Sequence, residues 1–213
     1  MILNNTFEVS APPEMVFDFM MDPERVVPTI PGATFKGAED EDHWSAEVKA
    51  SLGPMSLKFK GDVEVVKRDR DNLDMGLKGK GREVTGKGKA TADISTKLIA
   101  KDDGGTRVEI TTDLSIVGKA AQFGGPIIED VAAKFTEDFA SNMERVLAAE
   151  TKVEEAEAAG DEVAVEAAKE AAQQEVAQVH AEAAKPVSGI AVFFQLIARF
   201  FRNLFGGGQK NNA

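Results

Sequence analysis

The chain has 213 residues, of which 36 are acidic and 25 basic, and its net charge is −11. This charge argues against a nucleic-acid partner, because phosphate binding requires a basic face. The sequence contains no cysteine, which excludes disulfides, thiolate catalysis and thiolate metal sites. The N-terminus lacks the pattern of a signal peptide, and no apolar run reaches the roughly 20 residues that span a bilayer. We therefore expect a cytoplasmic protein.

The chain begins with an expected strand and two short helices. Residues 2–9 alternate between apolar and polar side chains, as a half-buried strand does. Pro12-Pro13 and Pro23 are placed where the first turn of a helix accepts proline, and Asp22 is placed as an N-cap. The turn Ile30-Pro31-Gly32 ends this part of the chain.

From residue 44 to residue 116 the apolar residues recur at every second position, through about six strands. The cleanest alternation covers 55–65, and Asp102–Gly105 has the composition of a hairpin turn. One side of each strand is polar. We therefore predict an antiparallel sheet that is covered on one side only.

Between Gly118 and Leu147 the apolar period becomes that of a helix. Six large apolar residues lie three or four positions apart and form one stripe. They are Ile128, Val131, Phe135, Phe139, Met143 and Val146. These features predict an α+β fold for residues 1–147, in which a curled antiparallel sheet of about seven strands surrounds one long C-terminal helix.

The face of the sheet that should meet this helix carries unusually small side chains. They are Ala46, Ala50, Gly61, Gly79, Gly81, Gly88, Ala90 and Ala92. Protein interiors are normally packed to the density of organic crystals, so a hollow between sheet and helix is one interpretation. Glycines that mark bends or bulges, with a helix lying close to the sheet, are the other. The sequence leaves both open.

Residues 148–185 form an acidic segment rich in alanine and glutamate, with few large apolar residues and a break at Gly160. We interpret it as a partly helical spacer, about 55 Å long if it is fully helical at 1.5 Å per residue. His180 within it is expected to be exposed to solvent.

Residues 186–213 contain no acidic residue and are predicted to form an amphipathic tail helix. Its broad apolar face consists of Ile190, Phe193, Phe194, Ile197, Phe200, Phe201, Leu204 and Phe205. Arg199 and Arg202 lie on the opposite side, as in helices that lie in the plane of a bilayer interface. Docking on the body or on a partner protein is the alternative. We favour the membrane, because an acidic spacer should hold the tail away from an acidic body.

Residues suited to catalysis are scarce. His43 follows four acidic residues and fits a solvated hairpin tip better than a ligand cluster. The glycine-rich stretch Gly76–Gly88 has the period of a strand and precedes no helix, unlike a phosphate-binding loop. No carboxylate pair, nucleophile–base pair or metal-ligand spacing stands out. We therefore predict no catalytic residue and no metal site, and we do not expect an enzyme.

Residues 1–147 resemble the CoxG family of carbon monoxide dehydrogenase subunits. The resemblance is carried by Val9–Pro12, Asp22-Pro23, Ile30–Gly32, Leu52–Pro54, Phe59–Gly61, Gly104–Val108 and, most specifically, Val117–Gly124. That family belongs to the helix-grip (SRPBCC) superfamily, which includes START lipid-transfer domains and polyketide cyclases. The resemblance implies an accessory protein that recruits molybdenum-containing carbon monoxide dehydrogenase to the membrane. It carries over no catalytic residue.

A hollow domain, if that interpretation holds, and a membrane-associating tail together suggest a carrier. Electrons from a soluble dehydrogenase must reach quinone in the bilayer, so we expect the domain to bind menaquinone or a similar isoprenoid quinone. The expected cavity residues are Met55, Leu57, Phe59, Met75, Leu77, Ala90, Ala92, Ile94, Ile128, Phe135 and Phe139. The protein should then lie on the inner face of the cell membrane. A membrane anchor without ligand and a cyclase-type enzyme are the alternatives.

Overall fold

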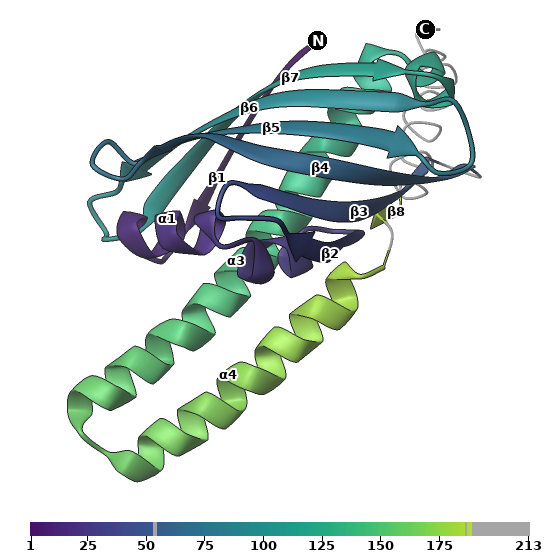
Figure 1. The fold of residues 1–213 in the computed structure, drawn as a ribbon. Helices are drawn as coiled ribbons and strands as arrows, with labels where there is room; N and C mark the ends of the chain where they lie inside the picture. The colour runs from purple at the N-terminus through teal and green to yellow at the C-terminus, as the bar shows by residue number, and fades with distance from the viewer. Residues whose placement is uncertain (53–54, 186, 189–213) are drawn as a thin grey trace, which may run out of the picture.

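The computed structural model describes residues 1–52, 55–185 and 187–188, so the predicted tail helix lies outside the described residues. Seven antiparallel strands form one curled sheet in the order β1-β7-β6-β5-β4-β3-β2 (Figure 1). They are β1 (Ile2–Val9), β2 (Ala33–Ala38), β3 (His43–Leu52), β4 (Met55–Asp69), β5 (Asp74–Glu83), β6 (Lys89–Ala100) and β7 (Thr106–Val117). The predicted sheet of about seven antiparallel strands is confirmed.

Two short helices and a turn connect β1 to β2, as the prolines predict. They are α1 (Pro13–Met21), α2 (Pro23–Val26) and the 3-10 turn η1 (Val27–Thr29). The Asp22 carboxylate caps α2, because it accepts hydrogen bonds from the backbone N–H groups of Glu24 and Arg25 at 3.0 and 3.3 Å. These elements cover one end of the sheet (Figure 1).

The long helix α3 (Gly125–Ala159) follows the 3-10 turn η2 (Lys119–Phe123) and crosses the concave side of the sheet (Figure 1). The predicted helix is therefore confirmed, but α3 continues past Leu147. The alanine- and glutamate-rich sequence after that residue favours helix, and nothing interrupts it before Gly160. Gly160 ends the helix in the left-handed conformation, with φ of 71°.

The acidic segment does not carry the chain away from the body, so that part of our interpretation is wrong. After Gly160, α4 (Glu162–Ala183) runs back beside α3 and forms a helical hairpin with it (Figure 1). Its last turns dock on the domain. Val179 is fully buried, and the Ala183 carbonyl accepts a hydrogen bond from the Gly32 N–H at 2.6 Å.

Hydrogen bonds between charged side chains also join α4 to α3. The Arg145 guanidinium donates hydrogen bonds to the carboxylates of Glu175 and Glu182. His180, which we expected to be exposed, lies half-buried on α4, and desolvation lowers its pKa. Beyond α4, the short strand β8 (Val187–Ser188) pairs in parallel with Ala50 and Ser51 of β3. None of the helices in the described part of the chain is long and apolar enough to cross a membrane.

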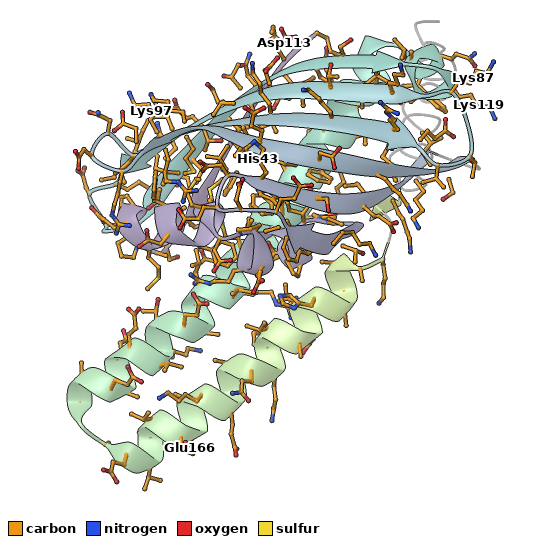
Figure 2. The ribbon with its side chains drawn as sticks, in the orientation of Figure 1. His43, Lys87, Lys97, Asp113, Lys119 and Glu166 are labelled. Atoms are coloured by element: carbon orange, nitrogen blue, oxygen red, sulfur yellow. The ribbon has the colours of Figure 1, made fainter. Side chains whose placement is uncertain are left out.

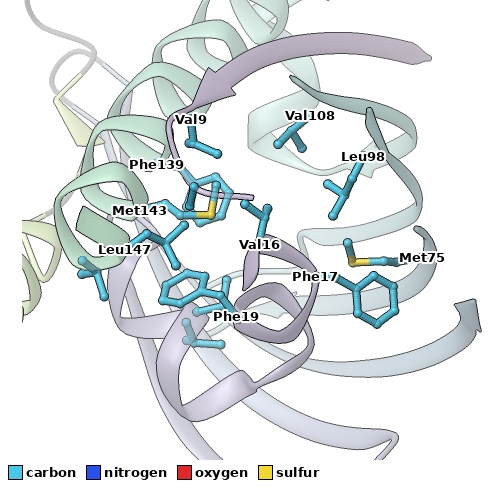
Figure 3. Packing of buried hydrophobic residues seen from close by; sticks show 14 of the residues in the cluster. Val9, Val16, Phe17, Phe19, Met75, Leu98, Val108, Phe139, Met143 and Leu147 are labelled. Carbon is cyan, nitrogen blue, oxygen red and sulfur yellow. The ribbon is translucent and has the colours of Figure 1, made fainter. Parts of the chain in front are cut away.

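The packed core lies at one end of the sheet. Figure 3 shows Val16 and Phe19 of α1 meeting Phe139, Met143 and Leu147 of α3. The ring of Phe139 also contacts Phe7 of β1 edge-on, with 5.8 Å between the centroids. The second half of the α3 stripe is thus buried by α1 and the strand ends around it.

Candidate ligand cavity

Small residues stand side by side on the concave face of the sheet. Strand pairing places Ala46 of β3 opposite Gly61 of β4, Gly61 opposite Gly81 of β5, and Gly81 opposite Ala90 of β6. In the adjoining row, Gly79 stands opposite Ala92. No side chain longer than a methyl group therefore projects from the first row over four neighbouring strands.

A cavity of about 260 Å³ lies over these rows. Its exposed lining is nearly all apolar. The lining residues are Ala46, Val48, Phe59, Gly61, Asp62, Val63, Gly79, Lys80, Gly81, Ala90, Thr91 and Ala92. The volume lies just below the usual range for small-molecule sites, about 300–1,000 Å³, and the apolar lining is typical of such sites.

The backbone does not require glycine at two positions of this wall. A methyl group on Gly79 would meet nothing nearer than the Ala92 carbonyl oxygen at 4.0 Å, and one on Gly81 would make ordinary contact with Phe59 at 3.7 Å. Neither residue has a positive φ. Gly61 differs, because a methyl group there would lie 3.0 Å from the Lys80 carbonyl oxygen. Close backbone approach therefore explains Gly61, whereas Gly79 and Gly81 each have room for a methyl group.

The part of α3 opposite the row of small residues is not tightly packed against the sheet. Along the α3 stripe, Ile128, Val131 and Phe135 are only half-buried, whereas Met143 and Val146 further along are 0% and 3% exposed. The same helix is therefore tightly packed at one end of the sheet and loosely covered at the other, where the small residues lie.

The predicted cavity residues fall into three groups. Phe59, Ala90 and Ala92 line the cavity. A second group is half-buried on the concave face or on α3, and it consists of Leu77, Ile94, Ile128 and Phe135. The third group is buried, and it consists of Leu57, Met75 and Phe139.

Two members of the buried group, Met75 and Phe139, belong to the packed core rather than to the cavity wall (Figure 3). The side chain of Met55 lies outside the described part of the chain, as do all eight tail residues predicted to bind the membrane. Val48 and Val63 line the cavity but were missing from the prediction. Val48 lies two positions after Ala46, and Val63 lies two positions after Gly61. This alternation in the sequence would have placed both on the same face as the small residues.

Glu83 is a charged residue on the concave side that the sequence did not single out. It follows Gly79 and Gly81 on the same side of β5, stands opposite Phe59 of β4, and is 8% exposed. One carboxylate oxygen accepts a hydrogen bond from the Thr85 hydroxyl at 3.2 Å. A carboxylate next to an apolar wall can accept a hydrogen bond from a ligand hydroxyl.

The histidine at the predicted hairpin tip has a local role. His43 is exposed, its Nδ1 lies 2.8 Å from an Asp40 carboxylate oxygen, and this hydrogen bond raises the pKa of His43. The prediction of a solvated hairpin tip is confirmed. Within residues 1–52, 55–185 and 187–188, no three His, Asp or Glu side chains are grouped so as to hold a metal ion.

A curled antiparallel sheet that holds a long helix over an apolar cavity defines the helix-grip class of domains. The chain belongs to the CoxG family of carbon monoxide dehydrogenase subunits, whose family model matches residues 6–148. No curated protein sequence matches the chain significantly.

The solved structures that are similar to this chain include two bacterial proteins. A conserved protein from Geobacillus kaustophilus is 22% identical with a TM-score of 0.63, and the match covers 70% of this chain and 95% of that one. A START superfamily protein from Mycobacterium smegmatis is 15% identical with a TM-score of 0.47, over 67% and 94% of the two chains.

The open space at Gly79 predicts that Gly79→Ala stabilises the domain by about 0.4–1 kcal/mol, because alanine restricts the unfolded chain. Urea unfolding measures this gain. Gly61→Ala is the matched control and should destabilise, since its methyl group would press on the Lys80 carbonyl oxygen. If both variants lose stability equally, the wall is packed and the cavity is absent in solution.

Proposed function

We propose that the protein is an accessory protein of molybdenum-containing carbon monoxide dehydrogenase that binds a menaquinone-like quinone and links the enzyme to the quinone pool of the membrane. Membership of the CoxG family supports the accessory role. The observation that supports a ligand is the apolar cavity over Gly79 and Gly81, two glycines that the backbone does not require.

The chemistry of the reaction calls for such a ligand. Oxidation of carbon monoxide with water to carbon dioxide releases two electrons and two protons, and a quinone takes up the same number to become a quinol. Quinones with isoprenoid tails reside in the bilayer, whereas the enzyme is soluble. A domain that takes a quinone into an apolar cavity would carry it between the two.

The geometry is suited to a long apolar ligand. The cavity over the small residues would take the ring, and the half-buried Ile128, Val131 and Phe135 of α3 would offer apolar contacts to an isoprenoid tail.

The ligand is tested by solvent extraction of the purified full-length protein and mass spectrometry of the extract. We expect an isoprenoid quinone in the wild type and its loss from a variant with a filled cavity. An extract free of lipophilic molecules, together with no binding of added menaquinone, would leave a membrane anchor without ligand. A polar molecule that the protein turns over would favour the cyclase-type alternative.

The membrane link is tested by deleting the tail. Wild type should float with liposomes, whereas a chain that ends after Ser188 should stay in solution. Ending there retains β8, so the melting temperature of the domain should not change. Each large apolar side chain contributes roughly 1.5–3 kcal/mol when fully buried, so the tail's eight should decide the outcome. Equal flotation of both proteins would place the membrane contact elsewhere.

A further inference from the structure

The convex face of the sheet carries three cations in direct register. Lys60 of β4 stands opposite Arg82 of β5, and Arg82 stands opposite Lys89 of β6. All three side chains are exposed. Like charges directly opposite each other destabilise a sheet, so stability alone does not account for this row.

Elsewhere the convex face mostly pairs opposite charges, although Asp93 stands opposite Asp113 and Lys49 opposite Lys58. Lys78 stands opposite Glu64 on one side and Asp93 on the other. Towards the other end of the sheet, Lys97 stands between Asp74 and Glu109. The row Lys60–Arg82–Lys89 differs from these single pairs because its like charges continue over three neighbouring strands.

Three further cations, Lys80, Lys87 and Lys119, lie around this row. Among the described residues, no carboxylate oxygen lies within 4.0 Å of the side-chain nitrogens of Lys80, Arg82, Lys87, Lys89 and Lys119. Lys60 lies 3.4 Å from Glu47, but that carboxylate is shared with Lys36 and Lys58. We call Lys60, Lys80, Arg82, Lys87, Lys89 and Lys119 the basic surface.

The basic surface lies at the end of the sheet from which the remaining chain departs. Figure 2 shows Lys87 and Lys119 at this end, and β8 pairs with β3 at Ala50 and Ser51, next to the exposed Lys49. The 25 residues that follow Ser188 contain three basic residues and no acidic one. The described chain therefore ends at the same end of the sheet as the basic surface, and the residues that follow it in sequence carry positive charge.

Negative charge is concentrated on the other side of the molecule. The α3–α4 hairpin beyond Leu147 carries ten acidic and two basic residues up to Glu182. Its tip, near Glu166, lies far from the Lys87 end of the sheet (Figures 1 and 2). A molecule with this separation of charge is oriented by a negatively charged surface, with its basic end inward and its acidic hairpin outward.

We infer that the basic surface binds the anionic headgroups of the bilayer and fixes the orientation of the domain on it. The inference rests on the membrane association proposed above and adds a second, electrostatic contact to that of the tail. An apolar segment combined with a basic patch is the combination that gives stable association with anionic membranes.

The test compares full-length wild type with the variant Lys60→Gln, Arg82→Gln, Lys89→Gln. Vesicles consist of phosphatidylcholine alone or of equal parts phosphatidylcholine and phosphatidylglycerol. Each basic residue close to an anionic membrane strengthens binding about fivefold, so the triple variant should bind the mixed vesicles on the order of 100-fold more weakly. Both proteins should bind phosphatidylcholine vesicles equally.

The control variant is Lys78→Gln, Lys97→Gln, Arg107→Gln, which removes the same net charge elsewhere on the sheet. It should bind the mixed vesicles nearly as wild type does. Wild-type affinity that is independent of phosphatidylglycerol, or equal losses in both variants, would overturn the inference. Loss of dehydrogenase binding instead of vesicle binding would assign the surface to a protein partner. These readouts do not depend on a bound quinone, so an empty cavity would leave their outcome unchanged.

Discussion

Ala92→Phe is expected to abolish binding of a menaquinone with a short isoprenoid tail while leaving the stability of the domain nearly unchanged. Ala92 lines the cavity and stands opposite Gly79, where there is open space. In a packed core the same enlargement would cost about 1–3 kcal/mol. Here the phenyl ring would occupy the space of the ligand.

Trp44 offers a direct readout of binding. It is the only tryptophan, and strand pairing places it in the row of Val63, Gly79 and Ala92. A bound quinone should quench its fluorescence in the wild type but not in Ala92→Phe. Ser95→Phe, on the exposed side of the same strand and outside the cavity lining, should bind as wild type does. Strong destabilisation by Ala92→Phe, with no lipophilic molecule in wild-type extracts, would refute the cavity and the carrier.

Met143→Ala should lower the free energy of unfolding by about 2–5 kcal/mol, the range for large apolar side chains in a packed core. Met143 is fully buried between α3 and the elements that cover the core end of the sheet. Chemical denaturation gives the loss from the shift in midpoint at constant slope.

The matched variant is Ile128→Ala, on the same stripe of the same helix but at its loosely covered end. Ile128 is only half-buried, so its removal should cost less than about 1.5 kcal/mol. Equal losses from the two variants would show that α3 packs against the sheet along its whole length, which would contradict the hollow.

The architecture of residues 1–147 could be predicted because its apolar periods are long and regular. Alternation of side chains gave the strands, and the three-to-four spacing gave the helix. The hairpin of α3 and α4 could not be predicted, because the segment contains few large apolar residues. Its docking depends on Val179, Ala183 and the bridges from Arg145, which join positions far apart in sequence. We interpreted Gly160 only as a break in the helix. It also marked the place where the chain reverses its direction between α3 and α4.

The cavity was only partly predictable for a related reason. Alternation identifies the face of a strand on which a residue lies, but not which part of that face a distant element covers. Phe17 and Phe19 of α1 fill one end of the concave side, and so Met75 and Phe139 became core residues. Phe59, Ala90 and Ala92 are outside this core cluster and line the cavity.

The separation of packed core and hollow along one helix has an evolutionary consequence. Substitutions at distant sites without shared partners have nearly additive effects on stability. Changes at Gly79, Ala90 or Ala92 should therefore alter which molecule is accepted without threatening the core around Met143. Substitutions in the cavity wall alone could therefore change the ligand preference during evolution. The core at the other end of the sheet would keep the domain stable.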